Sequence, residues 1–143
     1  MKRADWNHMF KLVGLLMEVY NELGRGLSEA IYQEAFEKEL ISNKIPFVRE
    51  KDLFVYYKGE LLKKYYTADF YSEGVIIEMK ATENLTSDNR AQLFNYLRIA
   101  KQELGILVNF GERSLHCERY VYDEEIDKYI LISKENFTDY ITD

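Results

Sequence analysis

The sequence lacks the residues that several common classes of site require. It has one cysteine, Cys117, so no disulfide can form within the chain and nothing indicates an oxidising compartment. Its two histidines, His8 and His116, form no metal-ligand spacing with each other or with Cys117. There is no glycine-rich phosphate loop, no serine–histidine–aspartate order and no zinc pattern. A disulfide scaffold, a zinc module and a serine hydrolase therefore have no support.

Long hydrophobic runs are also missing. The apolar stretch 9–20 is interrupted by Lys11 and Glu18, is too short to span a bilayer, and has no signal-peptide cleavage pattern. We therefore expect a cytoplasmic protein with no membrane contact. Without repeats or linkers, 143 residues predict one domain, made of an N-terminal helix (1–23), a core (24–122) and a C-terminal extension (123–143).

Positive charge is scarce, with a formal net charge of −6, which argues mildly against a tight nonspecific grip on a polyanion. The charge is segregated, however, because acidic residues concentrate in 29–39 and after Asp123. The basic residues near the centre of the chain are Lys58, Lys63, Lys64, Lys80, Arg90, Arg98 and Lys101. A nucleic-acid partner therefore remains compatible with the composition.

Hydrophobic periodicity predicts an order of elements. Apolar residues recur at helical spacing over 6–23, and a second helix starts near Ser28. Three antiparallel strands follow, then a helix and a buried parallel strand, and the tail is helix-biased. The expected elements after the second helix are strands 53–57, 61–71 and 75–80, helix 91–100 with Ser87 or Asp88 as its N-cap, and strands 105–110 and 115–122.

Residues 67–80, TADFYSEGVIIEMK, form the segment with the clearest chemistry. A two-residue turn at Glu73-Gly74 would pair Ser72 with Val75 and bring Asp69 opposite Glu78. Alternation along the strand then places Glu78 and Lys80 on one face. Charges in apolar strands are costly unless compensated, so two carboxylates and a lysine here indicate a site for a divalent cation and its water.

Asp69 followed by Glu78-x-Lys80 resembles the PD-(D/E)XK motif of restriction-endonuclease-like nucleases, with Ala68 where the motif has proline. Gly26-x-x-Glu29-x-x-Tyr32-Gln33 is similar to the signature of the GxxExxY protein family. Gln92-x-x-x-Tyr96 and the strand GILVNFG at 105–111 resemble later motifs of the same nucleases. The resemblance spans residues 24–111. It implies a restriction-endonuclease-like αβββαβ core, an α/β fold whose mixed central sheet is flanked by helices.

The resemblance also implies roles. Asp69, Glu78 and Lys80 would be catalytic, and Mg²⁺ or Mn²⁺ would be bound by Glu29, Asp69, Glu78 and the Met79 carbonyl. Residues expected to support the site or contact substrate are Gln92, Tyr96, Gln33 and Arg90. The protein would be a metal-dependent nuclease acting on nucleic acid, with DNA favoured over RNA. One small domain without a separate recognition module indicates a homodimer, a partner protein or low sequence specificity.

Plainer interpretations stay open for several of these residues. Glu29 could simply favour the start of a helix, and Lys80 could form an ion pair with Asp69 or Glu78. Tyr32 suits core packing, and the Gln92–Tyr96 pair could make structural hydrogen bonds. At the level of function, the alternative is a catalytically inactive nucleic-acid- or protein-binding module that retains the nuclease fold.

Overall fold

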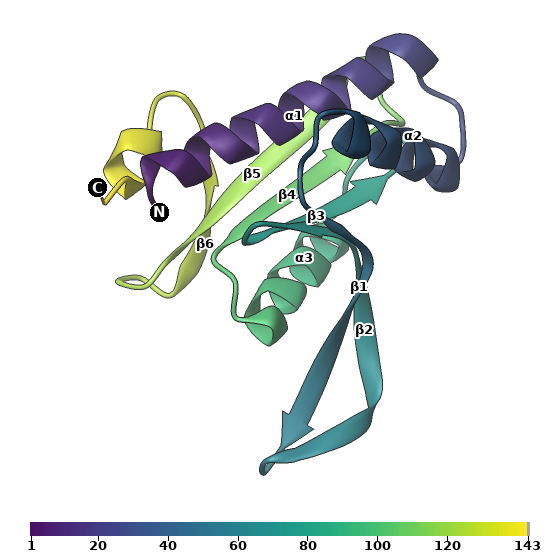
Figure 1. Ribbon diagram of the computed structural model, residues 1–143. Coiled ribbons are helices and arrows are strands. Elements are labelled where there is room, and N and C mark those ends of the chain that lie inside the picture. Colours follow the sequence, from purple (N-terminus) through teal and green to yellow (C-terminus); the bar gives the residue numbers. More distant parts are fainter. Residues whose placement is uncertain (143) are drawn as a thin grey trace.

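The computed structural model describes residues 1–142 as one mixed six-stranded sheet with helices on both faces (Figure 1). Two helices come first, α1 (Arg3–Leu23) and α2 (Glu29–Ser42), and α3 (Ser87–Ala100) lies between β3 and β4 in the chain. The strands are β1 (Val48–Tyr57), β2 (Glu60–Ser72), β3 (Val75–Lys80), β4 (Leu104–Asn109), β5 (His116–Asp123) and β6 (Lys128–Ile132). A short 3₁₀ helix, Phe137–Tyr140, ends the described chain.

The strand order follows the chain order, β1 to β6. Only β3 and β4 run parallel, because α3 carries the chain back between them, and every other neighbouring pair is antiparallel. The expected αβββαβ core is thus confirmed. None of the helices within residues 1–142 has both the length and the apolar character needed to cross a bilayer.

Alternation along β3 assigns its side chains to two hydrophobic cores. Val75, Ile77 and Met79 pack into the larger core beneath α1 and α2, whereas Ile76 joins the smaller core beneath α3. Glu78 and Lys80 have the same parity as Ile76, so they lie on the α3 side of the sheet. The face that was expected to carry the site is therefore covered by one helix only.

The expected starts of one strand and one helix were wrong, and the tail is not mainly helical. The first strand begins at Val48 rather than at residue 53, and α3 is capped by Thr86, whose side chain accepts a hydrogen bond from the Asn89 amide. The tail expected to be helical instead contains strand β6, which pairs with the edge of β5. Its apolar residues Ile130 and Ile132 complete the larger core from that edge, so tertiary pairing decided the conformation of the tail.

Candidate functional site

The β2–β3 turn fixes the geometry of the site. Glu73 and Gly74 both have positive φ, 45° and 91°, as a tight two-residue hairpin turn requires. Ser72 pairs with Val75, as expected from the sequence, and Phe70 pairs with Ile77. One step further along the two strands, Asp69 lies opposite Glu78.

At that step the side-chain carboxyls of Asp69 and Glu78 accept hydrogen bonds from backbone amides of the opposite strand. The Asp69 amide donates to Glu78 Oε1 at 2.9 Å, and the Met79 amide donates to Asp69 Oδ2 at 2.8 Å. The two carboxyl groups are therefore crossed between the strands and held close together. Each keeps one oxygen that neither of these hydrogen bonds uses.

Burial makes this pair costly to ionise. Glu78 is 3% exposed, and burial followed by the negative charge of Asp69 raises its pKa to about 8. The pKa of Asp69 is also raised, first of all by burial. Without a cation, the pair therefore holds a proton more strongly than an isolated carboxyl does. A bound divalent cation would favour the ionised form of both groups.

Lys80 lies beside the pair but is held by an uncharged partner. Its Nζ donates to Gln92 Oε1 at 3.1 Å, and no ion pair joins it to Asp69 or Glu78 among residues 1–142. The alternative of a lysine neutralised by a neighbouring carboxylate is thus not what the structure contains. Lys80 is half-buried at the end of β3, with its ammonium directed to α3 by Gln92.

Tyr96 lies one turn after Gln92 on α3 and is buried. Burial raises the pKa of its phenol, and the charges of Glu78 and Asp69 raise it further. Its ring lies 5.8 Å from the ring of Tyr66 on β2. Gln92 therefore holds Lys80, Tyr96 lies within electrostatic reach of the two carboxylates, and Tyr96 also joins α3 to the hairpin.

Glu29 is exposed at the start of α2, directly after the N-cap Ser28. Partial burial raises its pKa; the charge of Lys80 opposes this rise and that of Asp69 adds to it. Glu29 is therefore within electrostatic reach of the site, and among residues 1–142 no hydrogen bond or ion pair joins it to Asp69, Glu78 or Lys80. Gln33, on the next turn, is half-buried, and no hydrogen bond joins it to the site within the described chain.

Tyr32 is a core residue, as its plainer interpretation proposed. It is fully buried and stacks on Phe110 with ring centroids 4.3 Å apart. Its hydroxyl donates to the Gly24 carbonyl at 2.6 Å and accepts from the Leu27 amide at 3.2 Å. Tyr32 thus holds the loop that places Glu29, rather than contributing to the site itself.

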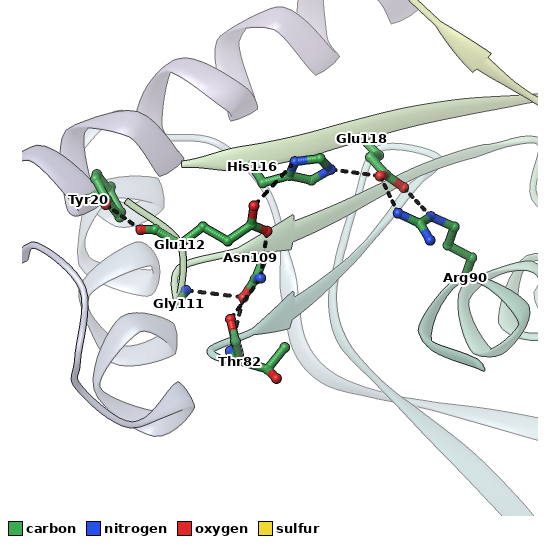
Figure 2. Close-up of polar contacts among 8 residues, drawn as sticks. All are labelled: Tyr20, Thr82, Arg90, Asn109, Gly111, Glu112, His116 and Glu118. Carbon is green, nitrogen blue, oxygen red and sulfur yellow. Dashed lines mark hydrogen bonds and ion pairs between the residues drawn. The ribbon is translucent and has the colours of Figure 1, made fainter. Parts of the chain in front are cut away.

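Arg90 is held by a carboxylate on the neighbouring strand β5. Its guanidinium donates two hydrogen bonds of 2.8 Å to the Glu118 carboxylate on β5 (Figure 2). This bidentate contact comes first among the causes that lower the pKa of Glu118 to about 2. His116 and Tyr120 bond to the same carboxylate. Arg90 therefore joins α3 to β5, and its role toward substrate stays a prediction.

Sequence reasoning missed two features that shape the site. The first is Glu50, a carboxylate of β1 that lies opposite Asp69, between the pairs Arg49–Phe70 and Lys51–Ala68. Its backbone has φ of +54°, uncommon for a residue with a side chain, and its charge contributes to the raised pKa of Asp69. A first strand expected to start at residue 53 left Glu50 in a loop.

The second missed feature is a clamp on the segment that follows Lys80 (Figure 2). The buried Asn109 carboxamide accepts from the amides of Thr82 and Gly111 and donates to the Thr82 carbonyl and to Glu112. A Cβ on Gly111 would lie 2.0 Å from the Thr82 carbonyl oxygen, so only glycine allows this approach. Asn109 and Gly111 both belong to the motif GILVNFG, so this motif was the sequence signal from which the clamp could have been predicted.

The donor chemistry fits Mg²⁺ or Mn²⁺. Within residues 1–142 there is no group of three or more His, Cys, Asp or Glu side chains arranged to hold a metal ion. Mg²⁺, however, commonly takes only one or two protein carboxylates and completes its shell with water and phosphate oxygens. The crossed, buried carboxyls of Asp69 and Glu78 meet that requirement. Glu29 and the Met79 carbonyl remain predictions as further ligands.

An open groove of about 630 Å³ runs beside the site along α3. Tyr66 lies on its β2 side, and the exposed Arg98 lies further along the helix. Gln92 and Tyr96 line the groove as well. A substrate in the groove would therefore contact the same two residues that adjoin Lys80 and the carboxylates.

Comparison with protein-family models gives a match to the PD-(D/E)XK nuclease superfamily over residues 7–120. Comparison with curated proteins and with solved structures gives no match. The matched range contains α2, the β2–β3 hairpin, α3 and β4, and with them every residue that sequence reasoning assigned to the site.

Proposed function

The chain belongs to the PD-(D/E)XK nuclease superfamily, and on that premise we propose that it is a metal-dependent nuclease that hydrolyses phosphodiester bonds of DNA or RNA. The observation that carries the proposal is the crossed pair of buried carboxyls, Asp69 and Glu78, with the Lys80 ammonium beside it, held by the uncharged Gln92. The motif around Glu29 supports the finer assignment to the GxxExxY family.

In this proposal Asp69 and Glu78 hold the cation, and Glu29 and the Met79 carbonyl complete its ligands. When bound, the cation supplies polarisation of the phosphate and a lower pKa for water. Lys80 orients the attacking water and stabilises the negative charge that develops as the bond from phosphorus to the leaving oxygen breaks. Gln92 fixes the position of the ammonium, because its carboxamide oxygen accepts the Lys80 hydrogen bond.

DNA is the first substrate to test, followed by RNA. The clearest experiment is a panel of single-stranded, double-stranded and branched DNA and RNA, incubated with Mn²⁺ and with Mg²⁺. We expect the wild type to cleave at least one member, EDTA to abolish cleavage, and Lys80→Ala to lower the rate at least 100-fold. Lys11→Ala, which removes an exposed lysine from α1, is the matched control and should cleave like the wild type.

Two results would contradict the proposal. Cleavage that survives in Lys80→Ala would come from a contaminant or from a different site. Metal binding without cleavage of any nucleic acid in the panel would instead favour an inactive binding module with the nuclease fold. We also propose that a homodimer or a partner protein supplies specificity, whether the domain cleaves nucleic acid or only binds it.

A further inference from the structure

The outer part of the β1–β2 hairpin extends away from the body of the protein (Figure 1). We call residues 53–66 the arm. β2 has 13 residues, but its pairing with β3 is limited to Phe70, Tyr71 and Ser72, so in the arm β2 pairs only with β1. Within residues 1–142 the arm is therefore a two-stranded ribbon with no third strand beside it.

The arm exposes an unusual amount of aromatic and aliphatic surface. Tyr56 and Tyr57 are 64% and 62% exposed, and exposed apolar or aromatic side chains continue along both strands. The others are Phe54, Leu61, Leu62, Tyr65 and Tyr66. Isolated exposed apolar residues need no explanation, but a continuous set of this size indicates an interaction surface.

The charge of the arm is opposite to that of the whole chain. Lys58, Lys63 and Lys64 are all exposed, and Glu60 is the only acidic residue between positions 53 and 66. The Lys58 ammonium also lies 5.5 Å from the centre of the Tyr57 ring. In a chain with a net charge of −6, this is a local positive surface with aromatic rings among its lysines.

The arm leads directly to the candidate active site. Leu53 at its base is buried in the core beneath α3, and Tyr66 contacts Tyr96 and lines the groove along α3. The same groove reaches Gln92, which holds Lys80. A chain-like ligand lying along the arm would therefore continue into the groove and reach Gln92 and Tyr96, which adjoin Lys80 and the two carboxylates.

We propose that the arm is a binding site for single-stranded nucleic acid that guides a strand into the groove beside α3; the destination of the strand rests on the proposed nuclease function. Unpaired bases stack on exposed aromatic rings, and lysines among the rings contact the phosphates, which is the chemistry of single-strand binding surfaces. Duplex DNA hides its base faces and would leave the rings unused. Docking of two arms against each other would bring the same lysines together.

The test is fluorescence anisotropy with fluorescein-labelled dT20, U20 and a 20-base-pair duplex, in EDTA so that no cleavage occurs. We expect the full chain to bind at least one single strand more tightly than the duplex. Tyr56→Ala/Tyr57→Ala should weaken single-strand binding about ten-fold and duplex binding much less. Lys63→Gln/Lys64→Gln should reduce the slope of log affinity against log salt by about 1.4, from about 0.7 per phosphate contact.

The matched control is Phe10→Ala/Lys11→Gln, which removes an exposed aromatic ring and a neighbouring lysine from α1. It should bind like the wild type. Tighter binding of dT20 or of U20 identifies the natural strand, and either supports the proposal. Equal losses in the control, or equal losses for duplex and single strand in the tyrosine variant, would overturn it.

Sedimentation velocity of the same proteins tests whether the arm instead binds a second copy of this chain. A stable dimer that dissociates in both arm variants would show that the arm binds a second copy of this chain, and the proposal would fail. The anisotropy assay needs no hydrolysis, so its outcome is separate from that of the nuclease proposal. Loss of cleavage in Lys80→Ala with intact single-strand binding would support both.

Discussion

Glu78 and Asp69 lie across from each other on neighbouring strands, and each carboxyl group accepts a hydrogen bond from a backbone amide of the opposite strand. Glu78 accepts from the Asp69 amide, and Asp69 accepts from the Met79 amide. The backbone pairing of β2 with β3 ends at Phe70 and Ile77, and at the next step two carboxyl groups lie side by side. The arrangement is stable without metal because each carboxyl has a hydrogen-bond donor, yet it is costly to ionise because both groups are shielded from water. Metal binding and pH should therefore both change the stability of the protein through this pair.

The first concerns metal binding. Mg²⁺ or Mn²⁺ at 100 times its dissociation constant should stabilise the wild type by about 2.7 kcal/mol, seen as a rise in Tm of several degrees. Asp69→Ala and Glu78→Ala should show no rise, because each removes half of the donor pair. Glu34→Ala, an exposed carboxylate on α2, is the control and should respond like the wild type. An equal rise in all four proteins would place the cation elsewhere.

The second concerns pH in the absence of metal. The pKa of Glu78 is about 8 in the folded protein against 4.5 as its ordinary value, so the folded state holds its proton more strongly. Its contribution to stability is therefore complete below pH 4.5 and is lost as pH rises through about 8. Urea unfolding in EDTA between pH 6 and 9 should show falling stability for the wild type and a flatter profile for Glu78→Gln.

The response to metal should have the opposite pH dependence. A cation requires ionised carboxylates, and its binding at neutral pH must displace the proton of Glu78. The rise in Tm with Mg²⁺ should therefore grow from pH 6 to pH 9. A rise in Tm that is independent of pH would mean that Glu78 is not a ligand.

The third prediction separates positioning from metal binding. Gln92→Ala leaves both carboxylates in place but removes the acceptor of the Lys80 hydrogen bond. We expect kcat for nucleic-acid cleavage to fall about 10- to 100-fold, with an unchanged rise in Tm on adding Mg²⁺. Gln102→Ala, a half-buried amide just beyond the end of α3, should cleave normally. Loss of the Tm response in Gln92→Ala would show that Gln92 supports the fold of the site rather than the lysine.

The fourth concerns the clamp after Lys80. Gly111→Ala would place a methyl group 2.0 Å from the Thr82 carbonyl oxygen and force the two segments apart. We expect a loss of about 1–3 kcal/mol in the free energy of unfolding, and slower cleavage even where the variant is folded. Gly14→Ala in α1, with no heavy atom within 4 Å of the new methyl, should instead gain about 1 kcal/mol. Normal stability of Gly111→Ala would contradict the close approach.

Local sequence signals were enough to predict the turn and the strands that carry the candidate site. The β2–β3 turn at Glu73-Gly74 sets the register, and the two-residue period of a strand then places Glu78 and Lys80 on one face, because both depend only on neighbouring residues. The continuous apolar run before Asn109 similarly predicted a central strand, because a strand buried on both faces is apolar throughout. For the tail, the same local signals misled, since β6 is stabilised by an edge of β5 that is distant in the sequence.

Contacts between elements that are distant in the sequence could be known from the three-dimensional structure alone. It assigned Arg90 to Glu118, brought Glu50 opposite Asp69, and left the arm of β1 and β2 without a third strand. Each outcome depends on contacts between elements far apart in the chain, and the charge or polarity of a single residue carries no information about them. Sequence could therefore name the carboxylates and the lysine, whereas packing determined their surroundings, and with them the pKa of Glu78 and the neutral partner of Lys80.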